Sequence, residues 1–190
     1  MWRRFCNWLL FTKRGWTVQV TVDHPARYII ALAPHTSNWD FILGKLYAGA
    51  NGWKINFLMK KEWFVWPLGY IFKALGGIPV YRSEKHNLTE QLVDIANRSK
   101  EFHLCITPEG TRQKTDVWKK GFYYIALNAH LPILLYGIDY EKRLIQCTKV
   151  VYPSGNINAD MKEIMEYYKP FKGKKANNFS TENIPLDDNL

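Results

Sequence analysis

The apolar positions of this chain are grouped in short runs with the length and composition typical of β-strands. Between most of these runs the apolar residues recur with helical spacing, as at Leu88–Ser99, and a last helix is expected after them at Asp160–Tyr168. This alternation predicts a single α/β domain with a largely parallel mixed sheet of about seven strands flanked by helices. The expected strands are Thr17–Val22, Tyr28–Ala33, Lys54–Met59, Ile78–Tyr81, Phe102–Thr107, Pro132–Ile138 and Leu144–Tyr152.

The start of one helix can be predicted. Asn87 is suited to cap the helix at Leu88–Ser99, and Glu90 stands three residues further on, as in a capping box.

The uncharged residues 121–138 approach the roughly 18-residue length of a membrane span. Because Asn128, His130 and Pro132 interrupt them, we expect a buried helix, a break and a buried strand instead of a transmembrane span.

The two ends of the chain differ from the middle. Residues 1–16, MWRRFCNWLLFTKRGW, interleave aromatic and basic side chains and lack the apolar length and cleavage site of a signal peptide. They predict a short helix that either lies in the plane of a membrane interface or packs on the core. Residues 17–175 are expected to form the folded domain, and the polar residues 176–190 a loose tail.

A second apolar segment, EWFVWPLGYIFKALGG at residues 62–77, contains many aromatic side chains and few charges. It is suited to present an apolar surface to a bilayer or to line an acyl channel. A buried helix with a proline break accounts for the pattern equally well.

Charge narrows the choice of partner. Lysine and arginine outnumber aspartate and glutamate by 26 to 17, which gives a net charge of +9. Such a balance favours an anionic partner, whether a lipid headgroup, a nucleic acid or an acidic carrier protein. The eight tryptophans and eleven tyrosines add side chains that favour the boundary between headgroups and acyl chains.

Several chemistries are disfavoured by missing motifs. Cys6, Cys105 and Cys147 are too far apart in the sequence for a metal-ligand spacing or a disulfide framework, so we expect a reducing compartment and no bound metal. A phosphate-cradling glycine loop and the G-x-S-x-G elbow of serine hydrolases do not occur.

Polar side chains follow the ends of several expected strands. Open α/β sheets bind their ligands beyond the carboxyl ends of the strands, so these side chains should line one edge of the sheet. They are His35, the pair Lys60 and Lys61, Arg82, and the group Glu109, Gly110, Thr111 and Arg112.

His35 stands just before a predicted helix start, where Ser37 is suited to the N-cap and Asp40 to the N3 position of a capping box. A carboxylate in the first turn can reach back to such a histidine and fix its tautomer, which leaves the other ring nitrogen free to take a proton. Taken alone, the pair is also explained as a strand-end histidine beside a helix cap.

The PEGTR turn after the fifth strand brings a carboxylate, a hydroxyl and a guanidinium together. Arg112 would bind phosphate oxygens, Thr111 and the Gly110 amide would donate hydrogen bonds, and Glu109 would accept from hydroxyls or orient the arginine. Arg82, in GGIPVYR, would add a second cation by the same reasoning.

In order and spacing, four segments resemble the conserved blocks of the glycerolipid acyltransferases of the 1-acyl-sn-glycerol-3-phosphate acyltransferase type. They are His35-x4-Asp40, GGIPVYR, PEGTR and LPILLYG, and they span roughly residues 34–137. The resemblance implies that His35 is the general base and Asp40 its partner. It also implies that Arg82, Glu109, Gly110, Thr111 and Arg112 form the glycerophosphate site, with Lys60 and Lys61 matching a basic position less firmly.

The resemblance further implies a fatty acyl transfer, without a cofactor, from acyl carrier protein or coenzyme A thioesters to a lysophospholipid hydroxyl. It implies a peripheral enzyme on the cytoplasmic side of a membrane, with no nucleic-acid partner. Pro34 stands where an asparagine usually precedes the histidine, so a lyso-aminolipid or another hydroxylated lipid is the alternative acceptor. A non-catalytic basic protein that binds membranes is the remote alternative.

Overall fold

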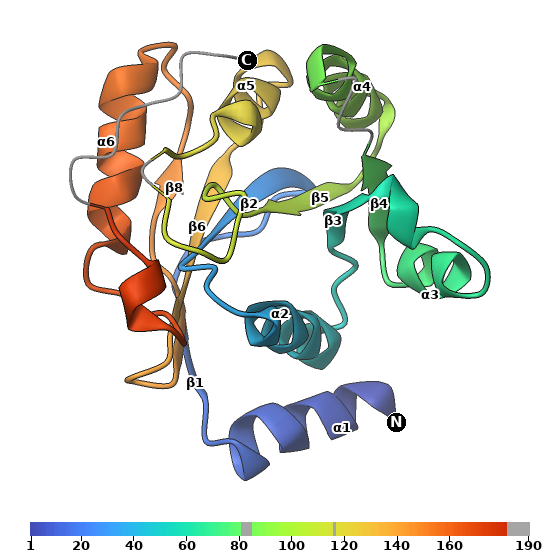
Figure 1. The fold of residues 1–190 in the computed structure, drawn as a ribbon, viewed down its shortest axis with the longest axis vertical. Helices are drawn as coiled ribbons and strands as arrows, with labels where there is room; N and C mark the ends of the chain where they lie inside the picture. The colour runs from blue at the N-terminus through green and yellow to red at the C-terminus, as the bar shows by residue number, and fades with distance from the viewer. Residues whose placement is uncertain (81–84, 116, 182–190) are drawn as a thin grey trace.

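The computed structural model describes residues 1–80, 85–115 and 117–181, and within these ranges it contains one eight-stranded sheet flanked by helices (Figure 1). The strands are β1 (Thr17–Val20), β2 (Arg27–Ala33), β3 (Asn56–Lys60), β4 (Gly77–Val80), β5 (Phe102–Ile106), β6 (Ile133–Asp139), β7 (Leu144–Cys147) and β8 (Val150–Val151). The α-helices are α1 (Trp2–Asn7), α2 (Asn38–Asn51), α3 (Leu68–Ala74), α4 (Lys85–Arg98), α5 (Gly121–Asn128) and α6 (Ile157–Tyr168). A π-helix, η1 (Trp8–Lys13), continues α1, and η2 (Lys61–Trp63) and η3 (Ala176–Asn178) are short 3-10 helices.

The sheet has the order β1-β7-β6-β2-β5-β3-β4, with β8 also paired to β6. Strand β2 is parallel to both β5 and β6, and β3 is parallel to both β5 and β4. Only the pairs of β6 with β7 and with β8 are antiparallel among the described strands. The prediction of a largely parallel mixed sheet is therefore confirmed, and the carboxyl ends of β2 to β6 lie at one edge.

The strand expected at Leu144–Tyr152 is interrupted. Gly137 of β6 pairs with Gln146, whereas Ile133 pairs with Val151, so four steps along β6 correspond to five along its partner. One extra residue of this kind marks a β-bulge, which separates β7 from β8 around residues 148–149.

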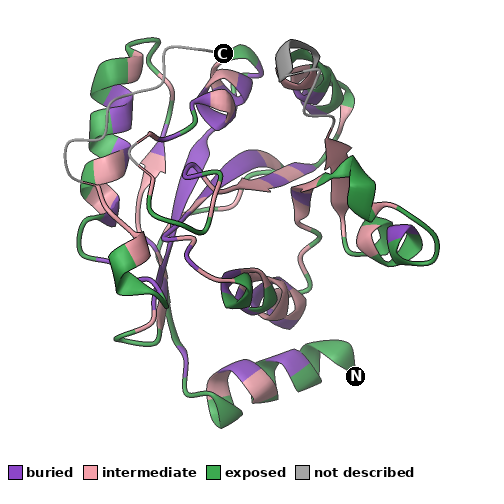
Figure 2. Ribbon diagram, viewed as in Figure 1, coloured by how far each residue is buried: buried purple, intermediate pink, exposed green. Residues whose placement is uncertain are grey.

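Two apolar cores lie on the two faces of the sheet, and consecutive residues of β2 supply them in turn, as alternation along a strand requires. Ile29 belongs to the core beneath α4, α5 and α6, and Ile30 belongs to the core beneath α2 and η1. The central strands are accordingly the most buried part of the chain (Figure 2).

The N-terminal helices pack against α2 along one face. Cys6 and Leu10 are fully buried, and the side chains of Arg3 and Asn7 both donate hydrogen bonds to the carbonyl of Ala50 near the end of α2. The opposite face of this segment carries the exposed aromatic side chains Trp2, Phe5 and Trp8. Residues 1–13 therefore pack on the core and also present an aromatic face outward.

The structure confirms one of the two predictions of helix boundaries and contradicts the other. The helix, break and strand expected in residues 121–138 are confirmed as α5, a turn and β6. The cap predicted at Asn87 is wrong, because α4 begins earlier, at Lys85, and Asn87 lies inside the helix. Within the described ranges, no helix has the length and apolar character needed to cross a bilayer.

The apolar segment at residues 62–77 is exposed, so it is not a buried helix. Around α3 the side chains of Trp63, Val65, Trp66, Tyr70 and Ile71 are all more than half exposed. At the other end of the chain, Phe179 from the predicted tail packs against the ring of Trp118, with the two ring centroids 6.3 Å apart.

Candidate active site

The loop from β2 into α2 holds His35, and the first turn of α2 holds Asp40, as the spacing predicts. Ser37 is the N-cap of α2, its hydroxyl accepts from the amide of Trp39, and Asp40 completes a capping box, which confirms the predicted helix start. The Nδ1 atom of His35 lies 3.3 Å from Oδ2 of Asp40. This contact does not meet hydrogen-bond geometry, so Nδ1 of His35 has no hydrogen-bond partner within the described residues.

The carboxylate of Asp40 is held from several sides. Its Oδ2 atom accepts hydrogen bonds from the backbone amides of Thr36 and Ser37, both at 2.8 Å. The Asp40 side chain is 0% exposed, whereas that of His35 is 19% exposed. The aspartate is thus buried and fixed, and the histidine ring beside it remains within reach of a ligand.

Tyr140, which the sequence analysis missed, holds the second carboxylate oxygen. Its hydroxyl donates a 2.6 Å hydrogen bond to Oδ1 of Asp40. Burial, reinforced by this bond and by the negative charge of Asp40, raises the pKa of Tyr140. The available signal was its position, because Tyr140 directly follows β6 at the same edge where His35 follows β2.

Glu109 contacts the histidine loop rather than facing a ligand. The backbone amide of His35 donates to both Oε1 and Oε2 of Glu109, each at 3.0 Å, and the glutamate is only 4% exposed. Burial raises the pKa of Glu109 to about 8, the His35 amide lowers it and the charge of Asp40 raises it further. These bonds join the PEGTR turn to the loop of His35, and the role expected for Glu109 toward a ligand hydroxyl or the arginine stays a prediction.

The other residues of the turn differ in what they offer a ligand. Gly110 has a φ of +64°, which favours glycine, and its amide donates to the carbonyl of Thr107 instead of pointing toward a phosphate. The hydroxyl of Thr111 accepts from the amide of Gln113. Arg112 is exposed, and its guanidinium has no hydrogen bond or ion pair among the residues that the structure describes.

The lysines expected at this edge are also exposed. Lys60 is the last residue of β3 and Lys61 the first of η2, so both lie at the carboxyl end of a strand parallel to β5. Arg82 lies outside the described residues. Within those residues no group of three histidine, cysteine, aspartate or glutamate side chains is placed to hold a metal ion.

Comparison with known proteins identifies a family and one related sequence. The family described as Acyltransferase matches residues 17–138, which is more than half of the chain. A 1-acyl-sn-glycerol-3-phosphate acyltransferase from Cocos nucifera is 36% identical over 83 residues, a match covering 40% of this chain and 27% of the length of that relative.

A solved structure supports the fold. The 1-acyl-sn-glycerophosphate (LPA) acyltransferase PlsC from Thermotoga maritima superposes with a TM-score of 0.60. The superposition covers 88% of this chain and 75% of the other, at 19% sequence identity. The likeness therefore extends over most of the α/β domain.

Proposed function

The chain belongs to the acyltransferase family, and from this premise we propose that it transfers a fatty acyl group from an acyl thioester to a hydroxyl of a lysophospholipid such as 1-acyl-glycerol-3-phosphate. The observation that carries the proposal is the pairing of a partly exposed His35 with the fixed, buried carboxylate of Asp40. Arg112, which is exposed, follows β5, and β5 is parallel to β2, so the chain leaves the sheet there at the edge where His35 lies.

The proposed reaction is a direct transfer. The Nε2 atom of His35 takes the proton of the acceptor hydroxyl as its oxygen attacks the thioester carbonyl. The tetrahedral intermediate collapses, the carbon–sulfur bond breaks, and the thiolate leaves and takes the proton from the imidazolium. Asp40 keeps Nδ1 protonated and stabilises the positive charge of the ring while it holds the proton.

The surrounding residues are proposed to divide two tasks. Tyr140 and the amides of Thr36 and Ser37 hold Asp40, and Glu109 holds the backbone of His35. Binding of the acceptor phosphate falls to Arg112, assisted by the hydroxyl of Thr111, because a guanidinium can bond two phosphate oxygens at once. Lys60, Lys61 and Arg82 are proposed to add positive charge at the same edge.

The site is proposed to work at a membrane surface, with the protein bound peripherally on the cytoplasmic side. Two groups of exposed aromatic side chains, on α1–η1 and around α3, are suited to the headgroup boundary, and the net charge of +9 favours anionic lipids. The acyl donor is proposed to be a thioester of acyl carrier protein or coenzyme A.

Product identification tests this function. Purified protein is incubated with lysophosphatidic acid or a lyso-aminolipid, each with acyl carrier protein and coenzyme A thioesters, and the products are identified by mass spectrometry. We expect phosphatidic acid from wild type and a loss of at least about 100-fold in His35→Ala, the scale of general-base catalysis. The matched control, His130→Asn, changes an exposed histidine whose positive φ asparagine tolerates, and it should stay active.

The outcomes separate the parts of the proposal. Acylation of the lyso-aminolipid without any phosphatidic acid would replace the acceptor and retain the chemistry. Full activity of His35→Ala with either acceptor would overturn the chemistry itself.

A further inference from the structure

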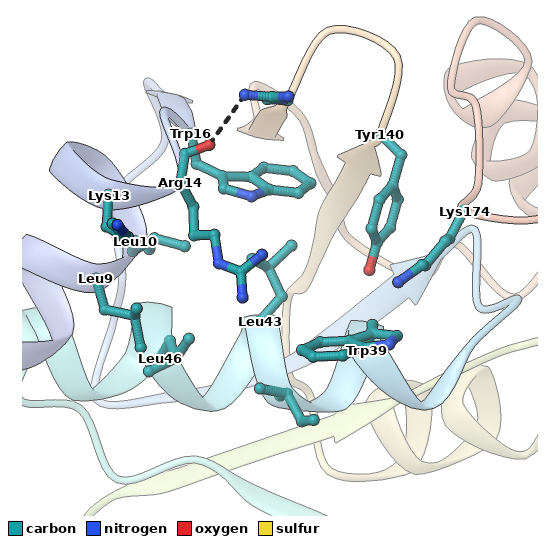
Figure 3. Close-up of a pocket in the computed structure, with 12 residues that line it drawn as sticks. Leu9, Leu10, Lys13, Arg14, Trp16, Trp39, Leu43, Leu46, Tyr140 and Lys174 are labelled. Carbon is teal, nitrogen blue, oxygen red and sulfur yellow. Dashed lines mark hydrogen bonds between the residues drawn. The ribbon is translucent and has the colours of Figure 1, made fainter.

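A hollow of about 430 Å³ lies between the N-terminal segment and α2, a size within the range of small-molecule sites (Figure 3). It is lined by residues of η1, α2 and the turn after β6. Tyr140 is part of its wall, but neither His35 nor any residue of the PEGTR turn lines it. A ligand here would therefore occupy a place distinct from the proposed reaction site.

One side of the hollow is apolar. Trp39, Ile42, Leu43 and Leu46 recur along α2 at the spacing of a single helix face, and Leu10 faces them from η1 (Figure 3). Trp39 and Ile42 are 48% and 43% exposed, so this face is not filled by other parts of the domain. Large apolar side chains left open in a hollow favour an apolar ligand segment.

The other side of the hollow is positively charged. Lys13, Arg14, Arg143 and Lys174 line it, and no aspartate or glutamate does. The Nζ atom of Lys174 lies 4.5 Å from the centre of the Trp39 ring, and Nη1 of Arg143 donates to the backbone carbonyl of Arg14. None of these four cations forms an ion pair with a carboxylate within the described ranges. Four like charges around one hollow give it a positive potential that favours a bound anion.

We propose that this hollow binds a single anionic phospholipid of the bilayer. Its phosphate would lie between Arg14 and Lys174, with the first part of one acyl chain against Ile42 and Leu46. The positively charged side chains would bind the phosphate, and the apolar face of α2 would bind the acyl chain. A free phosphate would therefore contact only the charged side of the hollow. The choice of a phospholipid also rests on the proposed function at a membrane.

The position of the hollow supports a bilayer lipid over a reacting substrate. Bound there, a lipid would touch the ring of Tyr140, while Asp40, fully buried, is held by the hydroxyl of the same tyrosine. The exposed Trp8 begins η1, the helix that also supplies Leu9, Leu10 and Lys13 to the hollow. The hollow and the aromatic surface proposed to face the membrane therefore share the segment η1.

The site can be tested with soluble lipids and no acyl donor. Dioctanoyl phosphatidylglycerol and dioctanoyl phosphatidylcholine are titrated below their micellar concentrations, with binding followed by calorimetry and stoichiometry by native mass spectrometry. We expect one phosphatidylglycerol per chain and at least about tenfold weaker binding of phosphatidylcholine, because the choline ammonium adds a positive charge beside the cations of the hollow. Glycerol 3-phosphate, which lacks the acyl chains, and octanoate, which has one chain and a carboxylate in place of the phosphate, should both bind more weakly than phosphatidylglycerol.

Two matched pairs of variants locate the site. The double variant Arg14→Gln with Lys174→Gln should bind phosphatidylglycerol at least about tenfold more weakly. Lys100→Gln with Lys162→Gln removes the same charge from exposed positions on the other face and should bind within about twofold of wild type. Ile42→Ser should also weaken binding, whereas Ile95→Ser, at a residue 44% exposed on α4, should not.

The inference would be overturned by the absence of saturable binding, by equal affinity for both phospholipids, by octanoate binding as tightly as phosphatidylglycerol, or by equal losses in the control variants. Because the assay contains no thioester, such a failure would leave the proposed acyl transfer unaffected. Inactivity of the wild-type enzyme toward every acceptor would likewise leave the lipid site unaffected.

Discussion

The hydroxyl of Tyr140 donates a 2.6 Å hydrogen bond to Oδ1 of Asp40, across a separation of 100 residues in the sequence. The other carboxylate oxygen, Oδ2, accepts from two backbone amides and faces the ring of His35. Tyr140 therefore fixes the plane of the carboxylate that orients the proposed base. In our proposal it is a positioning residue, since it acts on His35 only through Asp40.

Removing the Tyr140 hydroxyl should slow the reaction without weakening substrate binding. In Tyr140→Phe we expect kcat to fall about tenfold, equivalent to roughly 1.4 kcal/mol of transition-state stabilisation, with KM for both substrates within about twofold of wild type. The matched control is Tyr123→Phe, because Tyr123 donates a 2.7 Å bond to the buried Asp160 on the far side of the sheet. Steady-state kinetics check the prediction, and an equal fall in kcat in both variants would assign Tyr140 a purely structural role.

Neutralising Asp40 should cost more activity than stability. Asp40→Asn retains an oxygen that can accept from the amides of Thr36 and Ser37, so α2 should keep its N-terminal cap. It loses the charge that stabilises the imidazolium, and we expect at least about a 100-fold loss of kcat. Asp160→Asn, at the other buried aspartate bonded to a tyrosine, should lower the melting temperature and leave kcat nearly unchanged. Loss of folded protein in Asp40→Asn, seen by circular dichroism, would contradict the prediction that this change affects activity more than stability.

Glu109 should make the stability of the protein depend on pH. Burial raises its pKa from 4.5 to about 8, so between these values the folded chain keeps a proton that the unfolded chain releases. The protonated carboxyl of Glu109 therefore gives its full contribution to the free energy of unfolding below about pH 4.5. This contribution is lost as the pH rises through 8, at up to roughly 1.4 kcal/mol per pH unit. From about pH 5.5 to 7.5, the free energy of unfolding of wild type should fall by about 2 kcal/mol relative to Glu109→Gln.

Urea denaturation at several pH values measures this difference. Glu101→Gln, at an exposed glutamate beside the start of β5, should follow the wild-type curve at every pH. Parallel curves for wild type and Glu109→Gln would show that the buried carboxyl ionises at the same pH in the folded and unfolded chains.

Strand order explains which parts of the site the sequence could predict. Alternating strands and helices imply parallel strands, and parallel strands place residues that follow them at one edge. In the sheet Ala31 of β2 pairs with Ile106 of β5, so His35 and Glu109 each lie a few residues past neighbouring strand ends. Their nearness was predictable, but the bond of the His35 amide to both oxygens of Glu109 depends on the exact path of two loops.

Tyr140 was missed for a related reason. Ala33 pairs with Gly137, which brings His35 and Tyr140 to the same edge, yet a tyrosine after an apolar strand is ordinary in sequence. The hollow beside α2 was even less predictable, because its lining residues come from η1, α2, the turn after β6 and Lys174. Side-chain packing between segments that are distant in the sequence produces no periodic pattern of apolar residues from which it could be predicted.

Arg112 should recognise the phosphate of the acceptor. In Arg112→Gln we expect KM for lysophosphatidic acid to rise at least about tenfold with little change in kcat, because charge-assisted bonds to phosphate are lost in ground and transition states alike. The effect should nearly vanish with a 1-acylglycerol, which has a hydroxyl but no phosphate. Arg98→Gln, at an exposed arginine of α4, is the control. An equal rise in KM for both acceptors would show that Arg112 does not bind the phosphate of the acceptor.

The exposed segment around α3 should contribute apolar binding to membranes that is independent of charge. Tyr70 and Tyr152 are both 73% exposed, but only Tyr70 lies among other exposed aromatic and aliphatic side chains, including Trp66 and Ile71. If this surface inserts into the headgroup region, Tyr70→Ser should weaken binding to neutral phosphatidylcholine vesicles by roughly threefold to tenfold, because each buried aromatic contributes on the order of 1 kcal/mol. Tyr152→Ser should bind as wild type does. Vesicle sedimentation measures both, and equal binding of Tyr70→Ser and Tyr152→Ser would leave the aromatic face of α1–η1 as the membrane contact.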